Sequence, residues 1–317
     1  MKNKQITYFL IFIGLLIIII IAANYINSKP NKSKSNPYEY KYDEFKKVNP
    51  ELISHKEVRQ IKIDIGDKGG IAAANNQIYL AAEKSVKILT PEGSLVSEFP
   101  LNDIPNCISV KGEKITVGFQ KSFTIYNQEG TVILNSPEIS DSTIITCLAI
   151  WDNEIVIADA GKRKVYIYNG NEETSAIEGV SGVENTHGFI IPSAKFDLAI
   201  NNENELWVVN PGIHSLQHYD ERGSLINSWR KTSLNIEGFC GCCNPSHFSF
   251  LQDGSFVTSE KAMPRIKIYD KKGEFKSVVA APDKFEENGR PSDIAVLNDL
   301  IIALDYDKKL IRIFEKK

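Results

Sequence analysis

A strand pattern that recurs six times along the chain constrains the fold more than any other feature of the sequence. Each copy opens with a short apolar strand, returns through a hairpin in a β-branched strand, and continues into outer strands. The first strands of the copies open at Gly70, Cys107, Cys147, Asp197, His247 and Asp293. A repeat of roughly 40 to 50 residues with four short strands is typical of a propeller blade.

The last copy is incomplete, and this indicates how the ring of blades closes. It ends after its third strand, residues 310–314, close to the C-terminus, whereas residues 57–65 have strand character but belong to no copy. We therefore expect residues 57–65 to supply the outer strand of the last blade, because closure leaves only short sheet edges. The predicted fold class is all-β, a six-bladed β-propeller with four-stranded blades.

The N-terminus predicts one transmembrane helix ahead of the propeller. Residues 6–23 are uncharged and apolar and span about 27 Å as a helix, enough for the hydrocarbon core of a bilayer. We interpret residues 1–24 as a membrane anchor, 25–56 as a polar stalk and 57–317 as the propeller. A cleaved signal peptide is the alternative, although no clean small-x-small cleavage site follows the apolar run.

Topology and charge limit the partners that we expect. A lone N-terminal anchor normally leaves its short N-terminus in the cytoplasm, so the body is expected to be extracytoplasmic, in the periplasm or at the cell surface. A formal net charge of −3 and a pI near 6.0 give no reason to expect nucleic-acid binding. The expected partners are the membrane, through the N-terminal helix, and a small ligand or a membrane protein.

The sequence motifs of the strands resemble those of a known repeat family. Asp197-Leu-Ala-Ile opens the fourth copy, and Ile155-Val-Ile-Ala-Asp precedes Val165-Tyr-Ile-Tyr in the third. This frame, over residues 57–317, resembles that of NHL-repeat propellers. Gly238-Phe-Cys-Gly-Cys-Cys-Asn-Pro is similar to a segment of a bacterial NHL-type group with a Gly-Cys-Cys-Asn-Pro signature. The resemblance implies the fold and the compartment, whereas propellers include lactonases, lyases, dehydrogenases and pure binding modules.

The position of each residue in the repeat predicts a site at the mouth of the central channel. Equivalent positions in a closed propeller point towards one axis, and five copies carry a titratable or thiol side chain where the first strand opens: Cys107, Cys147, Asp197, His247 and Asp293. The second strands return to the same face and end at Asp159, Asn210, Glu260 and Asp305. The loop with Cys240, Cys242 and Cys243 is expected to enter there too.

Three interpretations of these residues remain open. In the first, the cysteines are small buried apolar groups and the strand-end Asp residues cap turns. In the second, Cys147, Asp197 and His247, joined by Cys242 or Cys243, bind a Zn or Cu ion. In the third, Cys240, Cys242 and Cys243 take part in redox chemistry, although a bond between neighbouring cysteines is strained, since adjacent Cα atoms lie about 3.8 Å apart.

The function predicted from these observations is an extracytoplasmic module that binds a ligand or metal, or assists a redox reaction, through the channel mouth. One alternative is a metal-dependent hydrolase or lyase of the lactonase or peptidylamidoglycolate-lyase type, as the resemblance to propeller enzymes implies. Another alternative is a scaffold that binds a membrane protein through its rim. Those propeller enzymes combine carboxylate, Asn or His ligands with a general base, whereas this ring carries Cys107 and Cys147 at two of the equivalent positions.

Overall fold

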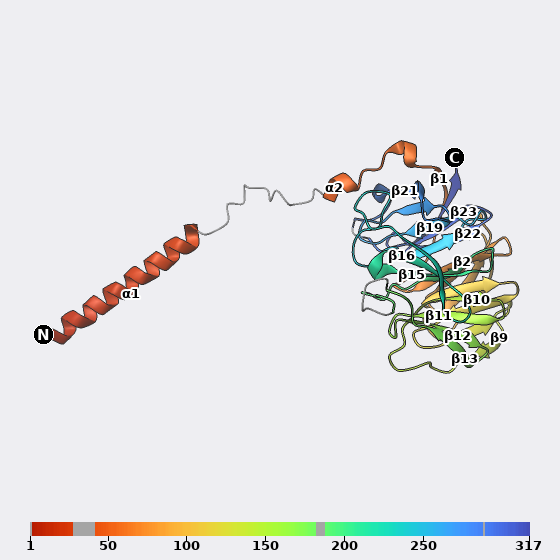
Figure 1. Ribbon diagram of the computed structural model, residues 1–317, viewed down its shortest axis with the longest axis horizontal. Coiled ribbons are helices and arrows are strands. Elements are labelled where there is room, and N and C mark those ends of the chain that lie inside the picture. The colour runs from red at the N-terminus through yellow and green to blue at the C-terminus, as the bar shows by residue number, and fades with distance from the viewer. Residues whose placement is uncertain (1, 28–41, 182–187, 288) are drawn as a thin grey trace. The chain divides into compact units, whose positions relative to one another are not determined.

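The structure is a computed structural model that describes residues 2–27, 42–181, 188–287 and 289–317. Its N-terminal unit contains one long helix, α1 (Lys2–Asn27), and its second unit, Asp43–Lys317, contains all the strands (Figure 1). Within the described ranges, α1 is the one helix long and apolar enough to cross a membrane, over Lys4–Tyr25 with a mean hydropathy of 3.0. A signal sequence would have the same properties.

Six four-stranded antiparallel sheets make up the second unit, as the repeats predicted. The first three blades contain β2 (Gly69–Ala74), β3 (Gln77–Ala82), β4 (Ser85–Leu89) and β5 (Leu95–Pro100); β6 (Cys107–Lys111), β7 (Lys114–Gly118), β8 (Phe123–Tyr126) and β9 (Val132–Asn135); β10 (Ile145–Trp151), β11 (Glu154–Asp159), β12 (Lys164–Asn169) and β13 (Glu172–Ile177). The fourth and fifth contain β14 (Leu198–Ile200), β15 (Leu206–Asn210), β16 (Ser215–Tyr219) and β17 (Leu225–Arg230); β18 (His247–Phe250), β19 (Phe256–Ser259), β20 (Ile266–Tyr269) and β21 (Phe275–Ala280).

The sixth blade joins the two ends of the propeller chain. Its sheet contains β22 (Asp293–Leu297), β23 (Leu300–Asp305) and β24 (Leu310–Lys316), with β1 (His55–Lys62) as the outermost strand. Strands β1 and β24 run antiparallel, with Lys62 opposite Leu310 and His55 opposite Lys316. The predicted closure of the ring is therefore confirmed, with β1 beginning two residues earlier than expected.

The innermost strand of every blade contacts the innermost strands of both neighbouring blades, from β2 through β6, β10, β14, β18 and β22 back to β2. These six strands enclose a central channel. The connecting segments add short helices, α2 (Tyr42–Phe45), η1 (Pro50–Leu52), η2 (Pro211–Ile213) and η3 (Pro282–Lys284). Side chains at the start of an innermost strand consequently share one small space around the axis.

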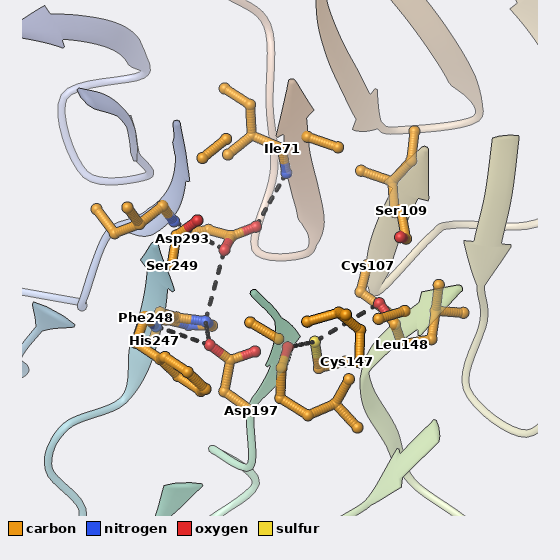
Figure 2. Close-up of a pocket in the computed structure, with 18 of the residues that line it drawn as sticks. Ile71, Cys107, Ser109, Cys147, Leu148, Asp197, His247, Phe248, Ser249 and Asp293 are labelled. Atoms are coloured by element: carbon orange, nitrogen blue, oxygen red, sulfur yellow. Dashed lines mark hydrogen bonds and ion pairs between the residues drawn. The ribbon is translucent and has the colours of Figure 1, made fainter. Parts of the chain in front are cut away.

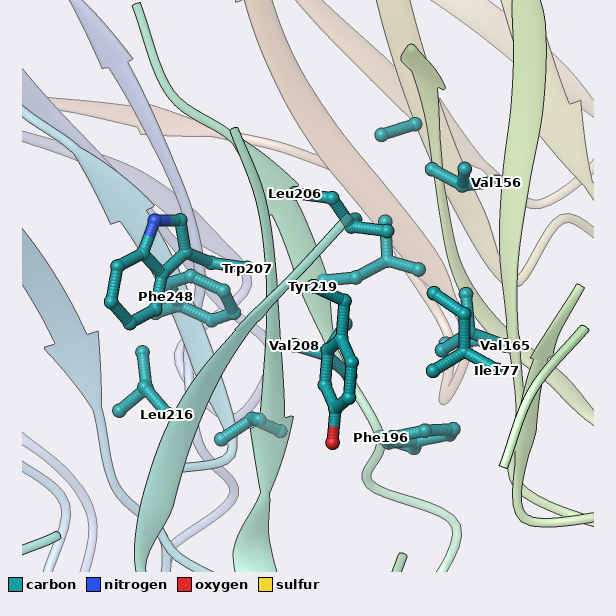
Figure 3. Packing of buried hydrophobic residues seen from close by; sticks show 14 of the residues in the cluster. Val156, Val165, Ile177, Phe196, Leu206, Trp207, Val208, Leu216, Tyr219 and Phe248 are labelled. Atoms are coloured by element: carbon teal, nitrogen blue, oxygen red, sulfur yellow. The ribbon is translucent and has the colours of Figure 1, made fainter. Parts of the chain in front are cut away.

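Apolar side chains on the facing sheet surfaces fill the spaces between blades. Figure 3 shows such a cluster, where Val165 and Ile177 of blade three meet Leu206 and Tyr219 of blade four. Each of these side chains is almost completely buried. Burial of one such side chain contributes about 1.5–3 kcal/mol, so packing between neighbouring blades keeps the ring rigid around its channel.

Candidate ligand site in the central channel

Two adjoining chambers lie along the central channel. The large chamber, about 530 Å³, is lined by the innermost strands of all six blades. The small chamber, about 310 Å³, is lined mainly by the segments that lead into those strands. Both chambers are lined by Gly69, Asn106, Thr146 and His247, so His247 lies where they meet. Cavities of this size accommodate small organic molecules.

His247 lies between two carboxylates from the neighbouring blades (Figure 2). Its Nδ1 is 3.7 Å from Asp197 Oδ2 and 3.6 Å from Asp293 Oδ1. Its Nε2 is buried and has no hydrogen-bond partner within the described residues. A buried imidazole nitrogen without a partner is costly in free energy, and a bound ligand can supply that partner.

The two carboxylates also tie blades together. Asp197 Oδ2 accepts a 2.8 Å hydrogen bond from the backbone N–H of Phe248 in the next blade. Asp293 Oδ2 accepts one of 2.9 Å from the N–H of Ile71, in blade one. Burial raises the pKa of Asp293, and the nearby Asp197 carboxylate raises it further, while His247 opposes the shift. Asp197 and Asp293 thus join neighbouring blades and also line the channel.

Cationic side chains line the small chamber beside His247. Arg290 forms ion pairs with Asp307 at 2.7 Å and Asp67 at 3.0 Å, and its guanidinium lies 5.4 Å from the centre of the Tyr306 ring. Lys195 forms no ion pair with any described residue. Burial lowers the pKa of Lys195, an effect that the Asp293 carboxylate partly offsets. Lys195 is therefore a partly buried ammonium group that lines a cavity.

Both channel cysteines are free thiols that lie near carboxylates. Cys107 and Cys147 line the large chamber with Asp197, His247 and Asp293, so all five side chains that the repeat position predicted share one cavity. Burial raises the pKa of each thiol strongly, and nearby carboxylates add to the shift. Cys147 Sγ donates to the backbone oxygen of Leu198 at 3.3 Å. Thiols in this state are poor nucleophiles and poor metal ligands.

The four residues at the ends of the second strands do not line either chamber. Asp159 Oδ1 accepts backbone hydrogen bonds from Ile144, Gly161 and Lys162, which is the turn-capping role. The others are bound to nearby groups: Asn210 to the N–H of Ile190, Glu260 to Arg265 and Lys267, and Asp305 to Arg312. The innermost strand separates these positions from the axis, so their side chains support loops rather than the channel.

The remaining cysteines lie on the loop before β18. All five cysteines of the chain are free thiols. Cys240 and Cys243 are buried and Cys242 is exposed, and none of them lines either chamber. Among the described residues, no three His, Cys, Asp or Glu side chains form a group that can hold a metal ion. The metal interpretation of Cys147, Asp197, His247, Cys242 and Cys243 therefore gains no support from the structure.

Sequence reasoning missed the cationic side of the channel. Lys195, Arg290 and Tyr306 line the small chamber but occupy loops outside the strand frame. A signal was nevertheless present, since Lys195 and Lys68 each stand two residues before a position that opens an innermost strand. Residues just upstream of such positions approach the same axis, so they too are candidates for the lining of the channel.

No family model and no curated protein matches the chain. Many solved structures share its fold, with low identity. A protein from Bacteroides thetaiotaomicron matches with a TM-score of 0.60 and 13% identity, over 83% of this chain and 77% of that one. Virginiamycin B lyase from Staphylococcus aureus matches with a TM-score of 0.54 and 12% identity, over 81% and 88%. A streptogramin B lyase structure gives 0.53 and 14%, over 83% and 88%. These likenesses show the propeller fold alone.

Proposed function

We propose that this protein is a membrane-anchored, extracytoplasmic binding module of the NHL type whose channel takes up a small polar molecule with an acidic group. Lys195 carries the proposal, because it is a partly buried ammonium group that lines the small chamber and has no ion-pair partner among the described residues. An anionic ligand group would compensate the cost of burying this charge. The unpartnered Nε2 of His247 offers a second polar contact at the junction of the chambers.

Thermal unfolding of the full chain in detergent tests the proposal. The protein is screened with small carboxylic acids and phosphate esters, each beside its neutral amide or alcohol. An acid at about 100 times its Kd should stabilise the folded protein by about 2.7 kcal/mol, whereas the neutral analogue should not. The proposal also predicts that the shift disappears in Lys195→Met.

Lys195→Met removes a partly buried charge with no ion-pair partner, so the variant is expected to fold. Lys114→Met is the matched control, because Lys114 is an exposed lysine at the start of β7. The control should respond to the acid as the unmodified chain does. A shift that persists in Lys195→Met, or a panel in which no acid stabilises the protein, would contradict the proposal.

A lyase is the second candidate function, and one observation favours it. Three groups suited to proton transfer lie together: His247 with a free Nε2, Asp293 with a raised pKa, and Lys195 with a lowered pKa. Two structures with the same fold are described as lyases, one of them of virginiamycin B. This candidate predicts that the full chain consumes virginiamycin B and that His247→Asn does not. Recovery of the unchanged compound from the unmodified chain would reject that substrate.

A further inference from the structure

Two adjacent cysteines face each other on the loop before β18. The Sγ atoms of Cys242 and Cys243 lie 3.2 Å apart as free thiols. Cys242 is exposed to solvent, whereas Cys243 is fully buried. An external reagent can therefore reach the Cys242 thiol, whereas the Cys243 thiol is shielded from solvent but adjacent to it.

Side-chain hydrogen bonds hold this loop in place. Asn244 Nδ2 donates to the backbone oxygen of Cys240 at 2.6 Å, and Asn244 Oδ1 accepts from the N–H of Lys261 at 2.9 Å. Ser246 Oγ donates to the backbone oxygen of Cys243 at 2.9 Å. The backbone on both sides of the two thiols is thus fixed by buried polar contacts, so their close approach does not depend on a loose surface loop.

Hydrogen-bond donors surround the sulfur of Cys243. Ser193 Oγ donates to Cys243 Sγ at 3.1 Å, and Lys261 Nζ donates to Ser193 Oγ at 3.2 Å. Burial disfavours the Cys243 thiolate, but the hydrogen bonds from Ser193, Cys242 and Lys261 outweigh burial and lower the pKa of Cys243. This setting differs from that of Cys107, Cys147 and Cys240, whose pKa values burial raises. It also differs from that of Cys242, because the hydrogen bond to Cys243 raises the pKa of Cys242. The sulfur of Cys243 is therefore the one whose thiolate is stabilised, and the thiolate is the reactive form of cysteine.

We propose that Cys242 and Cys243 form a redox-active dithiol that exchanges with an external disulfide. Cys242, the exposed thiol, loses its proton and its sulfur attacks one sulfur of the external disulfide, so that a mixed disulfide forms and the first thiolate leaves and takes up a proton. Cys243 then attacks Cys242 Sγ, forming the Cys242–Cys243 disulfide and expelling the second thiolate. The protein loses two electrons and two protons, and the external disulfide is reduced to two thiols.

The roles of the two cysteines follow from their positions. Cys242 is the accessible sulfur, so the external disulfide reacts there. Cys243 lies out of reach of a second external molecule, but its sulfur is 3.2 Å from that of Cys242. Lys261 acts as a positioning residue, because its Nζ donates to Ser193 Oγ, which in turn donates to Cys243 Sγ, and its positive charge favours the Cys243 thiolate.

Oxidised glutathione is the probe, applied to the reduced full chain in detergent. After acid quenching and alkylation, mass spectrometry of the tryptic peptide with all three loop cysteines counts the thiols. The unmodified chain should lose two thiols and keep no glutathione. Cys243→Ser should instead accumulate a stable glutathione adduct at Cys242, and Cys242→Ser should form neither product. Cys240→Ser should behave as the unmodified chain.

Lys261→Met supplies a readout that a purely structural role would not give. Its mixed disulfide should resolve about tenfold more slowly near pH 7, and the rate should recover at higher pH as Cys243 ionises. A disulfide that includes Cys240, a lasting glutathione adduct on the unmodified chain, or unchanged thiols after prolonged exposure would each overturn the proposal. Because no step involves the channel, this outcome is independent of the acid-binding test.

Discussion

The carboxylates beside His247 each serve two purposes, and this makes their replacement informative. Asp197 accepts the N–H of Phe248, and Asp293 accepts that of Ile71, so each joins its blade to the next. Both also lie at ion-pair distance from the imidazole of His247. Loss of either side chain therefore leaves a buried backbone donor without its acceptor and changes the charge near His247.

Asp197→Ala is expected to lower the free energy of unfolding by about 1–3 kcal/mol, because the N–H of Phe248 becomes unsatisfied inside the protein. Denaturant titration followed by tryptophan fluorescence measures the change. Asp103→Ala is the control, since Asp103 is exposed and its carboxylate accepts the N–H of the neighbouring Ile104, within the same loop. Equal stability of the two variants would contradict the bridging role of Asp197.

How far the site could be predicted depended on rotational symmetry. Cys107, Asp197 and His247 could be placed at the channel, since equivalent positions in the blades point towards one axis. The second strands were expected to bring Glu260 to the same face, but its side chain instead forms a buried ion pair with Arg265. Lys195 was missed because it lies two residues ahead of the strand position to which the rule was applied.

At the scale of elements, the closing strand β1 begins with a buried histidine, His55, whose protonation affects the stability of the fold. His55 is buried at the start of β1, and its Nδ1 lies 2.8 Å from Ser54 Oγ. Burial lowers the pKa of His55, and the ammonium groups of Lys316 and Lys317 lower it further. The unfolded chain therefore binds a proton at higher pH than the folded chain does.

The contribution of neutral His55 to stability is fully present above the unfolded pKa near 6.5 and is lost as the pH falls towards the lowered folded value. The free energy of unfolding should consequently fall between pH 7 and pH 5. His55→Gln, which stays neutral, should show a smaller fall, and His218→Gln should retain it. An identical pH profile for His55→Gln and the unmodified chain would argue against this account.

The strands themselves were predictable because each copy repeats the same alternation and turn pattern. The six copies of this strand pattern, each imperfect alone, together indicated the six blades. Residues 57–65 belonged to no copy, and pairing with the last blade gave them a place in the fold. The loop with Cys242 and Cys243 was harder to place. Its position depends on buried side-chain contacts such as that of Asn244 with Lys261, which no periodicity records.

At the scale of the whole molecule, α1 is the element that could attach the propeller to a membrane. The helix is apolar over Lys4–Tyr25, long enough to span a bilayer. We expect the mature protein from membranes of the producing cells to keep its N-terminus and to resist extraction by salt or alkali. Intact-mass measurement checks this expectation. A mature chain that starts near residue 24 would show a cleaved signal sequence instead.

A crystal structure of the full chain with the acid that stabilises it most tests the proposed channel function directly. The account predicts the acidic group in the small chamber, within about 3 Å of Lys195 Nζ, with a polar ligand atom near Nε2 of His247. The second unit also has an apolar cavity of about 790 Å³, lined by Met263, Phe285 and residues 46–48. An acid bound there, or anywhere outside the channel, would contradict the account.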